Sequence, residues 1–356
     1  MDCPNCGSPR TLKNGSGRAV CKDCRKSFNV DGPQPCVPAG HKLKGVSTLY
    51  GEDGAVKGQW VKTEADARRQ REIAEAAIKT LAQPLKGLAK PIKLERHDFA
   101  GKESAYIIGD AHFGAYAWGA EAGEDFDTDI ADRDLRAAID NLIASAPPSE
   151  TGLLVDVGDF LHADNRSNMT PAHGNQLDVD TRYQRVIRVA VDALRYCIGR
   201  MLQKHKHVQV FIVPGNHNPD SAGWLSLALA LYYENEPRVR VERSPAKFLY
   251  HTFGDVLIGL VHGDKVKLDQ LPSIMAADRA QDWGKARHRY WWTGHIHHTK
   301  HQEYRGCFVE SFNTLAARDA WHAENGYRAE RQMQRIDLDP QHGIYARQIC
   351  NIGMLR

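Results

Sequence analysis

Five short apolar runs between residues 105 and 298 each stop abruptly at polar residues. The runs are AYIIGD (105–110), TGLLVDVGD (151–159), VQVFIVPGNH (208–217), VLIGLVHGD (256–264) and RYWWTGHIHH (289–298). Such runs predict buried strands with polar residues at their carboxyl ends. Segments 129–146 and 181–203 lie between them and carry apolar residues at helical spacing. Strands that alternate with helices predict an α/β sandwich core.

The first hundred residues lack this regular pattern. Residues 42–63 alternate well enough to predict a short hairpin with its turn at GEDG, residues 51–54. The stretch from Thr63 to residue 83 is rich in Ala, Glu, Arg and Gln, which predicts a helix capped at Thr63 and ended by Pro84. We therefore expect three parts: residues 1–31, a linker over 32–100 with this hairpin and helix, and a catalytic domain over 101–356.

Composition and charge are those of a soluble globular protein. Hydrophobic residues make up 42% of the chain and charged residues 26%. No apolar run approaches the roughly 20 residues of a membrane span, and the N-terminus lacks the apolar stretch of a secretory signal. We therefore expect a cytoplasmic protein with no membrane partner. Residues 1–100 carry seven excess positive charges and residues 101–356 four excess negative ones, which indicates either an anionic partner for the N-terminal region or a solvated basic linker.

Each apolar run ends in residue types that bind metals. These residues are Asp110 and His112 after the first run, Asp159 after the second, Asn216 after the third, His262 after the fourth, and His295 and His297 after the fifth. Metals need such ligands at fixed places, and strand ends are rigid platforms for them. One such motif alone is weak evidence, but five in order, each behind a buried strand, indicate a metal site.

The ordered set D-x-H, GD, GNH, a lone His and GHxH resembles the calcineurin-like metallophosphoesterase superfamily over roughly residues 105–315. The resemblance implies a four-layer α/β/β/α metallophosphoesterase sandwich that holds two divalent ions, with manganese expected and iron, zinc or nickel as alternatives. It implies that Asp110, His112 and His297 bind one ion. It implies that Asn216, His262 and His295 bind the other ion, and that the Asp159 carboxylate bridges the two. Two ions about 3.5–4 Å apart activate water and neutralise charge on a phosphoryl group.

Two further histidines receive catalytic roles from the same resemblance. His217 matches the family's non-ligand histidine near the scissile phosphate, and we expect it to donate a proton to the leaving oxygen. His162 stands where many family phosphatases have Asp, and GDFLHADNRS resembles the double-strand-break repair exonuclease branch. That likeness implies that His162 contacts phosphate or helps to position His217. Asn218 stands where Asp or Glu is usual, which puts the orientation of the site's supporting residues in question.

Loops after the first two motifs offer substrate contacts. We expect such contacts from Asp164 and Asn165, within the second motif, and from His173, in NMTPAHGN. The loop over 113–128 holds Tyr116 and Trp118, which would either stack on a base or pack locally. Its acidic tail would repel a nucleic-acid backbone if it faced the site.

Four cysteines form two CxxC motifs separated by fourteen residues: Cys3, Cys6, Cys21 and Cys24. This spacing predicts one tetrahedral structural zinc ion. A segment so short could hardly fold without the metal. The segment resembles the zinc ribbons of transposases and similar DNA-binding proteins. Its modest positive charge suits contact with DNA or RNA, and docking to a protein is the alternative.

The leading hypothesis for function is a metal-dependent phosphodiesterase that hydrolyses nucleic acid, with DNA as the expected partner. The GDxxH variant, the CxxC segment and the basic N-terminal third support it. The alternatives are an enzyme for a small nucleotide or cyclic nucleotide, since the fold does not fix the substrate, and a non-catalytic nucleic-acid-binding adaptor, against which the intact ligand set argues. The sequence allows a homo-oligomer.

Overall fold

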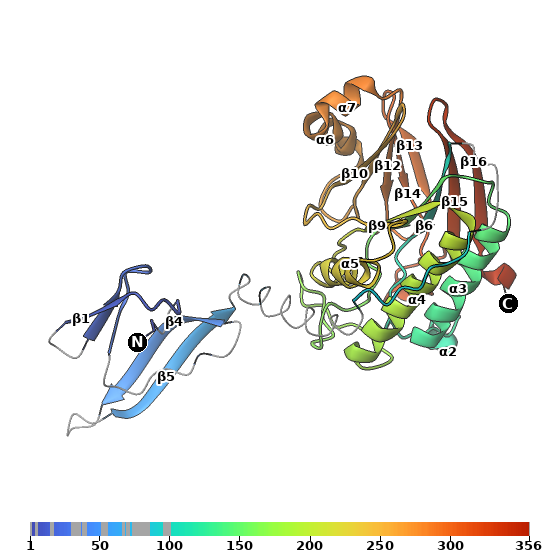
Figure 1. The fold of residues 1–356 in the computed structure, drawn as a ribbon. Helices are drawn as coiled ribbons and strands as arrows, with labels where there is room; N and C mark the ends of the chain where they lie inside the picture. The colour runs from blue at the N-terminus through green and yellow to red at the C-terminus, as the bar shows by residue number, and fades with distance from the viewer. Residues whose placement is uncertain are drawn as a thin grey trace. The chain divides into compact units, whose positions relative to one another are not determined.

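The computed structural model describes residues 2–3, 6–14, 18–29, 37, 41–50, 56–65, 68, 72, 86–94 and 101–355. The chain divides into two compact units, residues 1–84 and 85–356 (Figure 1). Among the described helices, none is both long and apolar enough to cross a lipid bilayer.

The larger unit contains a six-stranded sheet whose centre is parallel. Its strands, in spatial order, are β16 (Gly343–Asn351), β15 (Gln332–Asp339), β6 (Glu103–Ile108), β7 (Thr151–Asp156), β8 (His207–Ile212) and β9 (Val239–Val241). Strands β6 to β9 run parallel, and β15 and β16 add an antiparallel edge. The carboxyl ends of β6, β7 and β8 therefore meet at one edge of the sheet.

A second sheet of five strands repeats this arrangement. Its strands, in spatial order, are β10 (Leu249–Phe253), β11 (Val256–Leu260), β12 (His288–Thr293), β14 (Phe308–Ser311) and β13 (Lys300–Glu303). Strands β11, β12 and β14 are parallel, and the two outer strands are antiparallel to their neighbours. All five strands predicted from the apolar runs are present, as β6, β7, β8, β11 and β12.

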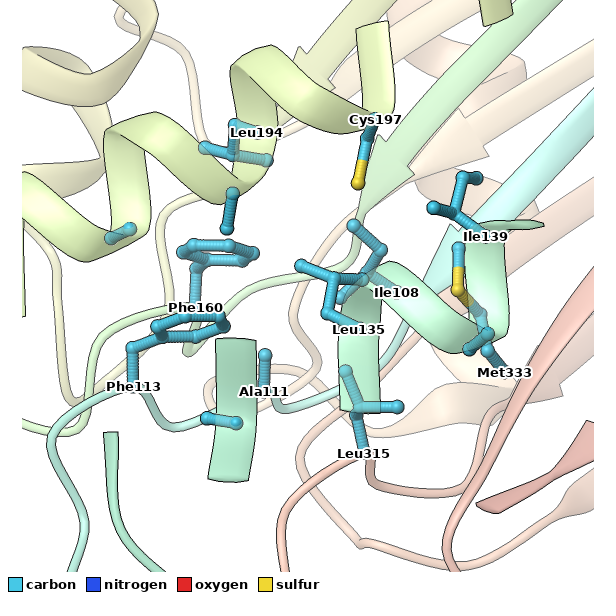
Figure 2. Close-up of a cluster of buried hydrophobic side chains, with 14 of the residues drawn as sticks. Ile108, Ala111, Phe113, Leu135, Ile139, Phe160, Leu194, Cys197, Leu315 and Met333 are labelled. Atoms are coloured by element: carbon cyan, nitrogen blue, oxygen red, sulfur yellow. The ribbon is translucent and has the colours of Figure 1, made fainter. Parts of the chain in front are cut away.

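Alternate residues of each strand face different layers, because successive side chains on a strand point to opposite faces. Ile107 packs between the sheets in one cluster with Ile258 and Trp292. Ile108 points the other way, into a cluster beneath α3 (Thr128–Ala144), α4 (Tyr183–Lys204) and α5 (Ser221–Tyr232), part of which Figure 2 shows. On the outer face of the second sheet, Trp291 packs with Leu271 and Met275 of α6 (Leu271–Asp278). The predicted four-layer α/β/β/α sandwich is confirmed.

The remaining elements of this unit are short. They are α2 (Gly119–Ala122), α7 (Ala280–Lys285), α8 (Ala320–Glu324) and the 3-10 turns η2 (Leu268–Gln270) and η3 (Ile352–Leu355). Residues 86–94 also belong to this unit: Ile92 packs against the helical cluster, and its carbonyl accepts a hydrogen bond from Arg238 Nη1 at 2.8 Å.

The smaller unit contains two separate antiparallel sheets. One is formed by β1 (Thr11–Asn14), β2 (Arg18–Cys21) and β3 (Ser27–Asn29), and the other by β4 (His41–Tyr50) and β5 (Val56–Ala65). The β4–β5 pair confirms the predicted hairpin. Its GEDG turn lies outside the described residues.

The helix predicted after the hairpin begins later than expected. Thr63 pairs with Leu43 in the β4–β5 ladder, so the prediction that Thr63 caps a helix is wrong. Strand pairing with a distant partner decides the conformation there, and local helix propensity does not. Arg68 and Glu72 are helical and form an ion pair of 3.0 Å. The rest of that predicted helix lies outside the described residues.

Candidate metal centre

The loops after β6 and β7 are joined directly behind the predicted ligands. The backbone N–H of His112 donates to the carbonyl of Asp159 at 3.0 Å, and that of Phe113 donates to the carbonyl of Phe160 at 2.8 Å. The rings of Phe113 and Phe160 stack at 4.8 Å in the buried cluster of Figure 2. The apolar core therefore fixes both ligand loops relative to each other.

The first group of ligand atoms comes from β6 and β12. The ligand atoms of Asp110, His112 and His297 lie within 4.8 Å of one another. His297 Nε2 is 3.3 Å from Asp110 Oδ1 and 3.2 Å from His112 Nε2. The side chains of Asp110 and His112 are buried. This is the ligand set that the sequence predicts for one ion.

The second group lies around Asp159. His262 Nε2 is 2.9 Å from Asp159 Oδ2 and 3.0 Å from Asn216 Oδ1, and His295 offers a ring nitrogen within the same group. The Nδ1–H of His262 donates to the carbonyl of Val157 at 3.0 Å, which leaves Nε2 free to bind a metal. The four predicted ligands from β7, β8, β11 and β12 are therefore together.

The two groups of ligand atoms are linked directly by hydrogen bonds. The backbone N–H of His295, in the second group, donates to both carboxylate oxygens of Asp110, in the first, at 3.1 and 3.0 Å. Asp159 in turn uses Oδ1 to accept from the backbone N–H of His217 at 2.8 Å, while Oδ2 faces His262. The donor set, carboxylates with imidazoles and one amide oxygen, suits a pair of divalent ions.

Left-handed backbone is concentrated at this centre. Eight non-glycine residues of the described chain have positive φ, and five are predicted ligands: Asp110, His112, Asp159, His295 and His297. Such conformations cost on the order of 1–3 kcal/mol each and persist where surrounding structure enforces them, typically at functional sites. The fold therefore holds these side chains in place at the expense of stability.

Two glycines beside the ligands leave no room for a side chain. A Cβ on Gly294 would lie 2.6 Å from Asp110 Oδ2, and one on Gly215 would overlap Asp159 Oδ1. These positions need glycine because backbone and carboxylate approach so closely.

Charges at the two groups perturb each other. Burial alone would raise the pKa of Asp159 and lower that of His262, but their ion pair reverses both: the pKa of Asp159 falls well below its usual range, and that of His262 rises to about 10. In the first group, burial, the charge of His217 and the charge of His297 lower the pKa of His112 well below its usual value. A neutral His112 is the form that binds a metal ion.

His217 and His162 lie side by side next to the first group. Their rings stack at 5.2 Å, and the Nδ1–H of His217 donates to the carbonyl of His162 at 2.8 Å. His162 Nδ1 is 3.2 Å from His112 Nδ1. Burial and the nearby charge of His217 lower the pKa of His162 to about 3, so its ring is neutral near pH 7. His162 thus supports His217 through its backbone and His112 through its ring.

Asn218 supports the centre from below. It is buried, and its Oδ1 accepts from the backbone N–H groups of Asp159 and Gly215, both at 3.2 Å. The amide oxygen of Asn218 thus accepts two backbone hydrogen bonds.

The three predicted substrate contacts have different surroundings. Asp164 is buried and accepts from Ser221 N at 2.8 Å and Ser221 Oγ at 2.6 Å, so it caps the start of α5. Asn165 Oδ1 accepts from the backbone N–H of Ser167 at 2.7 Å, and His173 lies exposed in the turn over 171–173. Contact of any of these three with substrate stays a prediction.

One pair beside the centre was missed by sequence reasoning. The ring of His322, in α8, stacks on that of His297 at 4.6 Å and 16°. Its Nδ1 is 2.6 Å from Asp319 Oδ1. Burial would raise the pKa of Asp319, but the hydrogen bond with His322 and its charge lower it to about 2. The only local signal is an Asp and a His three residues apart, which is too common to single out.

The four CxxC cysteines of the smaller unit lie together. Their sulfur atoms are all within 4.8 Å of one another, with Cys3–Cys24 and Cys6–Cys21 both at 3.6 Å. That spacing excludes disulfides, whose sulfurs lie about 2.05 Å apart, and suits a tetrahedral Cys₄ metal site with metal–sulfur bonds of about 2.3 Å.

The two CxxC motifs have the same backbone geometry. The residue after each second cysteine has positive φ, 71° at Gly7 and 58° at Arg25. Its N–H donates to the carbonyl of the first cysteine, at 2.8 Å to Cys3 and 3.0 Å to Cys21.

Searches with the sequence against protein-family models and against curated proteins gave no match. Three solved structures that are similar to the chain are a phosphodiesterase described as novel and archaeal (11% identity, 69% of this chain and 99% of that one, TM-score 0.36), a dimetal phosphatase from Danio rerio (9%, 70% and 98%, 0.35) and Vps29 of Entamoeba histolytica complexed with zinc (12%, 70% and 99%, 0.30). All three TM-scores lie below 0.5, so these likenesses support no inference about activity.

Proposed function

We propose that this chain is a dinuclear-metal phosphodiesterase that hydrolyses nucleic acid, with DNA as the expected substrate. One observation carries the chemistry: the ends of five strands, up to 187 residues apart in sequence, converge into two groups of ligand atoms that are linked directly by hydrogen bonds. Such a pair of sites suits two-metal hydrolysis of a phosphoric ester. The left-handed backbone at five of the seven ligands supports a functional rather than a structural role.

Each ion has a defined ligand set in this proposal. Asp110, His112 and His297 hold one, Asn216, His262 and His295 hold the other, and Asp159 touches both. When bound, two divalent ions of this class activate a water and neutralise charge that develops on the phosphoryl oxygens. Manganese is the ion we expect, and iron, zinc or nickel would fit the same donors.

His217 is the proposed proton donor to the leaving oxygen. Because its Nδ1–H is committed to the carbonyl of His162, its Nε2 is the atom available to substrate. His162 fixes this tautomer and orients His112, and this role fits the GDxxH motif of the exonuclease branch.

Charged and aromatic side chains of the smaller unit support a nucleic-acid substrate. Strands β4 and β5 carry four exposed lysines, and Trp60 is 60% exposed. The lysines are Lys42, Lys44, Lys57 and Lys62. Glu64 pairs with two of them, Lys42 and Lys44. Positive side chains beside an exposed ring are typical of surfaces that bind nucleic acid.

The Cys₄ cluster is the proposed structural zinc site of a ribbon that contacts DNA. Exposed Arg10, Lys22, Arg25 and Lys26 lie close to its cysteines in the sequence. Among the described residues no cysteine forms a disulfide, which fits a reducing compartment, and we propose the cytoplasm.

Incubation with Mn²⁺ and a substrate panel tests the proposal. The panel contains single-stranded DNA, duplex DNA, cyclic nucleotides and a chromogenic phosphodiester. We expect cleavage of DNA and of the dye, and loss of both activities in the Asp159→Ala variant. Cleavage of dye and cyclic nucleotide alone would replace nucleic acid with a small nucleotide substrate. No hydrolysis of any substrate by metal-loaded protein would reject the enzymatic role.

A further inference from the structure

Three exposed aromatic side chains lie on two neighbouring elements next to the metal centre. Trp118 and Trp321 are each 57% exposed, and Tyr116 is 46% exposed. Trp118 is the N-cap residue of α2, and Trp321 lies in α8. The two helices face each other across a hollow lined by Glu121 and Gly123 on one side and Ala323 on the other.

Both elements are attached to the same group of predicted ligands. The loop that carries Tyr116 and Trp118 leaves His112 directly, and the backbone N–H of Ala115 donates to the carbonyl of His112 at 3.0 Å. On the other side the rings run in series: His322 stacks on His297 at 4.6 Å, and Trp321 meets His322 edge-on at 5.1 Å. A single ring, that of His322, thus separates the exposed indole of Trp321 from the predicted ligand His297.

The acidic tail of this loop is largely occupied by internal partners. Its carboxylates pair as follows: Asp125 with the N–H of Gly119, Asp127 with the N–H of Ile130, Glu124 with Arg331 and Asp129 with Arg185. Two of these four carboxylates pair with an arginine, which offsets part of the negative charge that a polyanion would meet at this loop.

The charges beside α8 are mixed. Arg318 and Arg328 donate to the backbone carbonyl of Tyr327, and in the described chain neither forms an ion pair. They line the same hollow as Glu121 and Glu324. This balance favours recognition by stacking over a purely ionic contact.

We propose that Tyr116, Trp118 and Trp321 form an aromatic rim that stacks the unpaired bases of a single-stranded nucleic acid beside the metal centre. The proposal rests on the proposed nuclease function and adds the form of its substrate. Every base offers a π-face, so stacking retains a strand without reading its sequence. A duplex keeps its bases stacked on one another and would have to fray before it reached the rim.

The test uses the full-length Mn²⁺-loaded protein and two single strands of equal length. One carries ordinary bases, and the other carries stable tetrahydrofuran abasic residues. We expect the double variant Trp118→Ala/Trp321→Ala to raise KM for the ordinary strand about tenfold to a hundredfold and to leave the abasic strand unchanged. Trp118→Phe/Trp321→Phe should restore most of the affinity. Tyr345→Ala, at an exposed aromatic residue of β16, is the matched control.

The affinity for each strand is measured without turnover by fluorescence anisotropy, with labelled strands and protein that also carries His217→Ala. An unchanged KM and affinity in the double Ala variant would overturn the rim. Equal losses on both strands would also overturn it, because they would indicate a structural role. Failure of the wild-type protein to bind or cut either strand, with the dye still hydrolysed, would instead reject the nucleic-acid substrate, and the rim would lose its ligand.

Discussion

The two metal-ligand clusters of this chain are built in opposite ways. The ligands of the dinuclear centre project from strand ends above two large buried clusters, which do not include them. The Cys₄ cluster has no such support: the buried residues among the described positions 2–29 are Cys3, Ala19 and Cys21. Two of these three are the thiols themselves. One cluster is therefore placed on a folded core, and in the other the proposed metal ion would take the place of a core.

The largest expected effect follows from removing the metal of the Cys₄ cluster. Structural zinc contributes apparent free energies of about 10–16 kcal/mol to small domains of this type. A strong chelator, or Cys21→Ser, should therefore unfold residues 2–29 and leave the sandwich folded. Amide hydrogen exchange in each unit measures this, and Cys197→Ala, a cysteine substitution in α4, is the control. Protected amides in β1 to β3 of the metal-free protein would show that this segment folds without the metal ion.

The next largest effect is expected at Asp159, the proposed bridging carboxylate. Asp159→Ala should abolish binding of both ions and lower kcat/KM about a thousandfold or more, which corresponds to about 4 kcal/mol of transition-state stabilisation. The domain should stay folded, because its apolar clusters are untouched. Metal content by mass spectrometry and the circular dichroism melt report the two quantities separately. A variant that still holds both ions of the strand-end groups, besides the zinc ion of the Cys₄ cluster, would refute the bridging role.

His217→Ala should separate chemistry from metal binding. Loss of a general acid typically lowers kcat by about a hundredfold to ten-thousandfold, and the ions should remain because no ligand is removed. His301→Ala, at an exposed histidine of β13, serves as the control. Wild-type turnover by His217→Ala would show that another group protonates the leaving oxygen.

The smallest effect concerns the support beneath the centre. Asn218→Ala leaves the buried N–H groups of Asp159 and Gly215 without an acceptor, and one unpaired buried donor costs about 1–3 kcal/mol. We expect the midpoint of urea unfolding to fall accordingly, whereas Asn218→Asp keeps an acceptor and should lose less. Equal losses in the two variants would mean that the amide oxygen is not what holds Asp159.

Local sequence pattern predicted most of the sandwich. The five strands and the long helices α3 and α4 were predicted because buried strands and amphipathic helices each have a characteristic pattern of apolar residues along the sequence. Asp127 caps α3 by accepting a hydrogen bond from Ile130 N, and the helix begins at Thr128, one residue before the predicted start. Thr63 was predicted wrongly because its strand depends on Leu43, twenty residues earlier.

Residues whose roles depend on distant contacts were harder to predict. Substrate contact by Asp164 stays a prediction, but its hydrogen bonds to Ser221 at the start of α5 had no signal in the sequence. His322 gave no sequence signal, because its position matters only through the stack on His297. The sequence left Tyr116 and Trp118 open to either packing or stacking, and only the structure shows that both side chains are exposed.

The sequence by itself determined which residue types follow each strand and in what order, because strand length and hydrophobicity are local properties. Only the tertiary structure decided which of these residues lie next to one another. His112 and His297 meet at 3.2 Å although 185 residues separate them. Parallel pairing within each sheet and the packing of one sheet on the other bring the strand ends to one edge, and that register follows from the whole core rather than from any single segment.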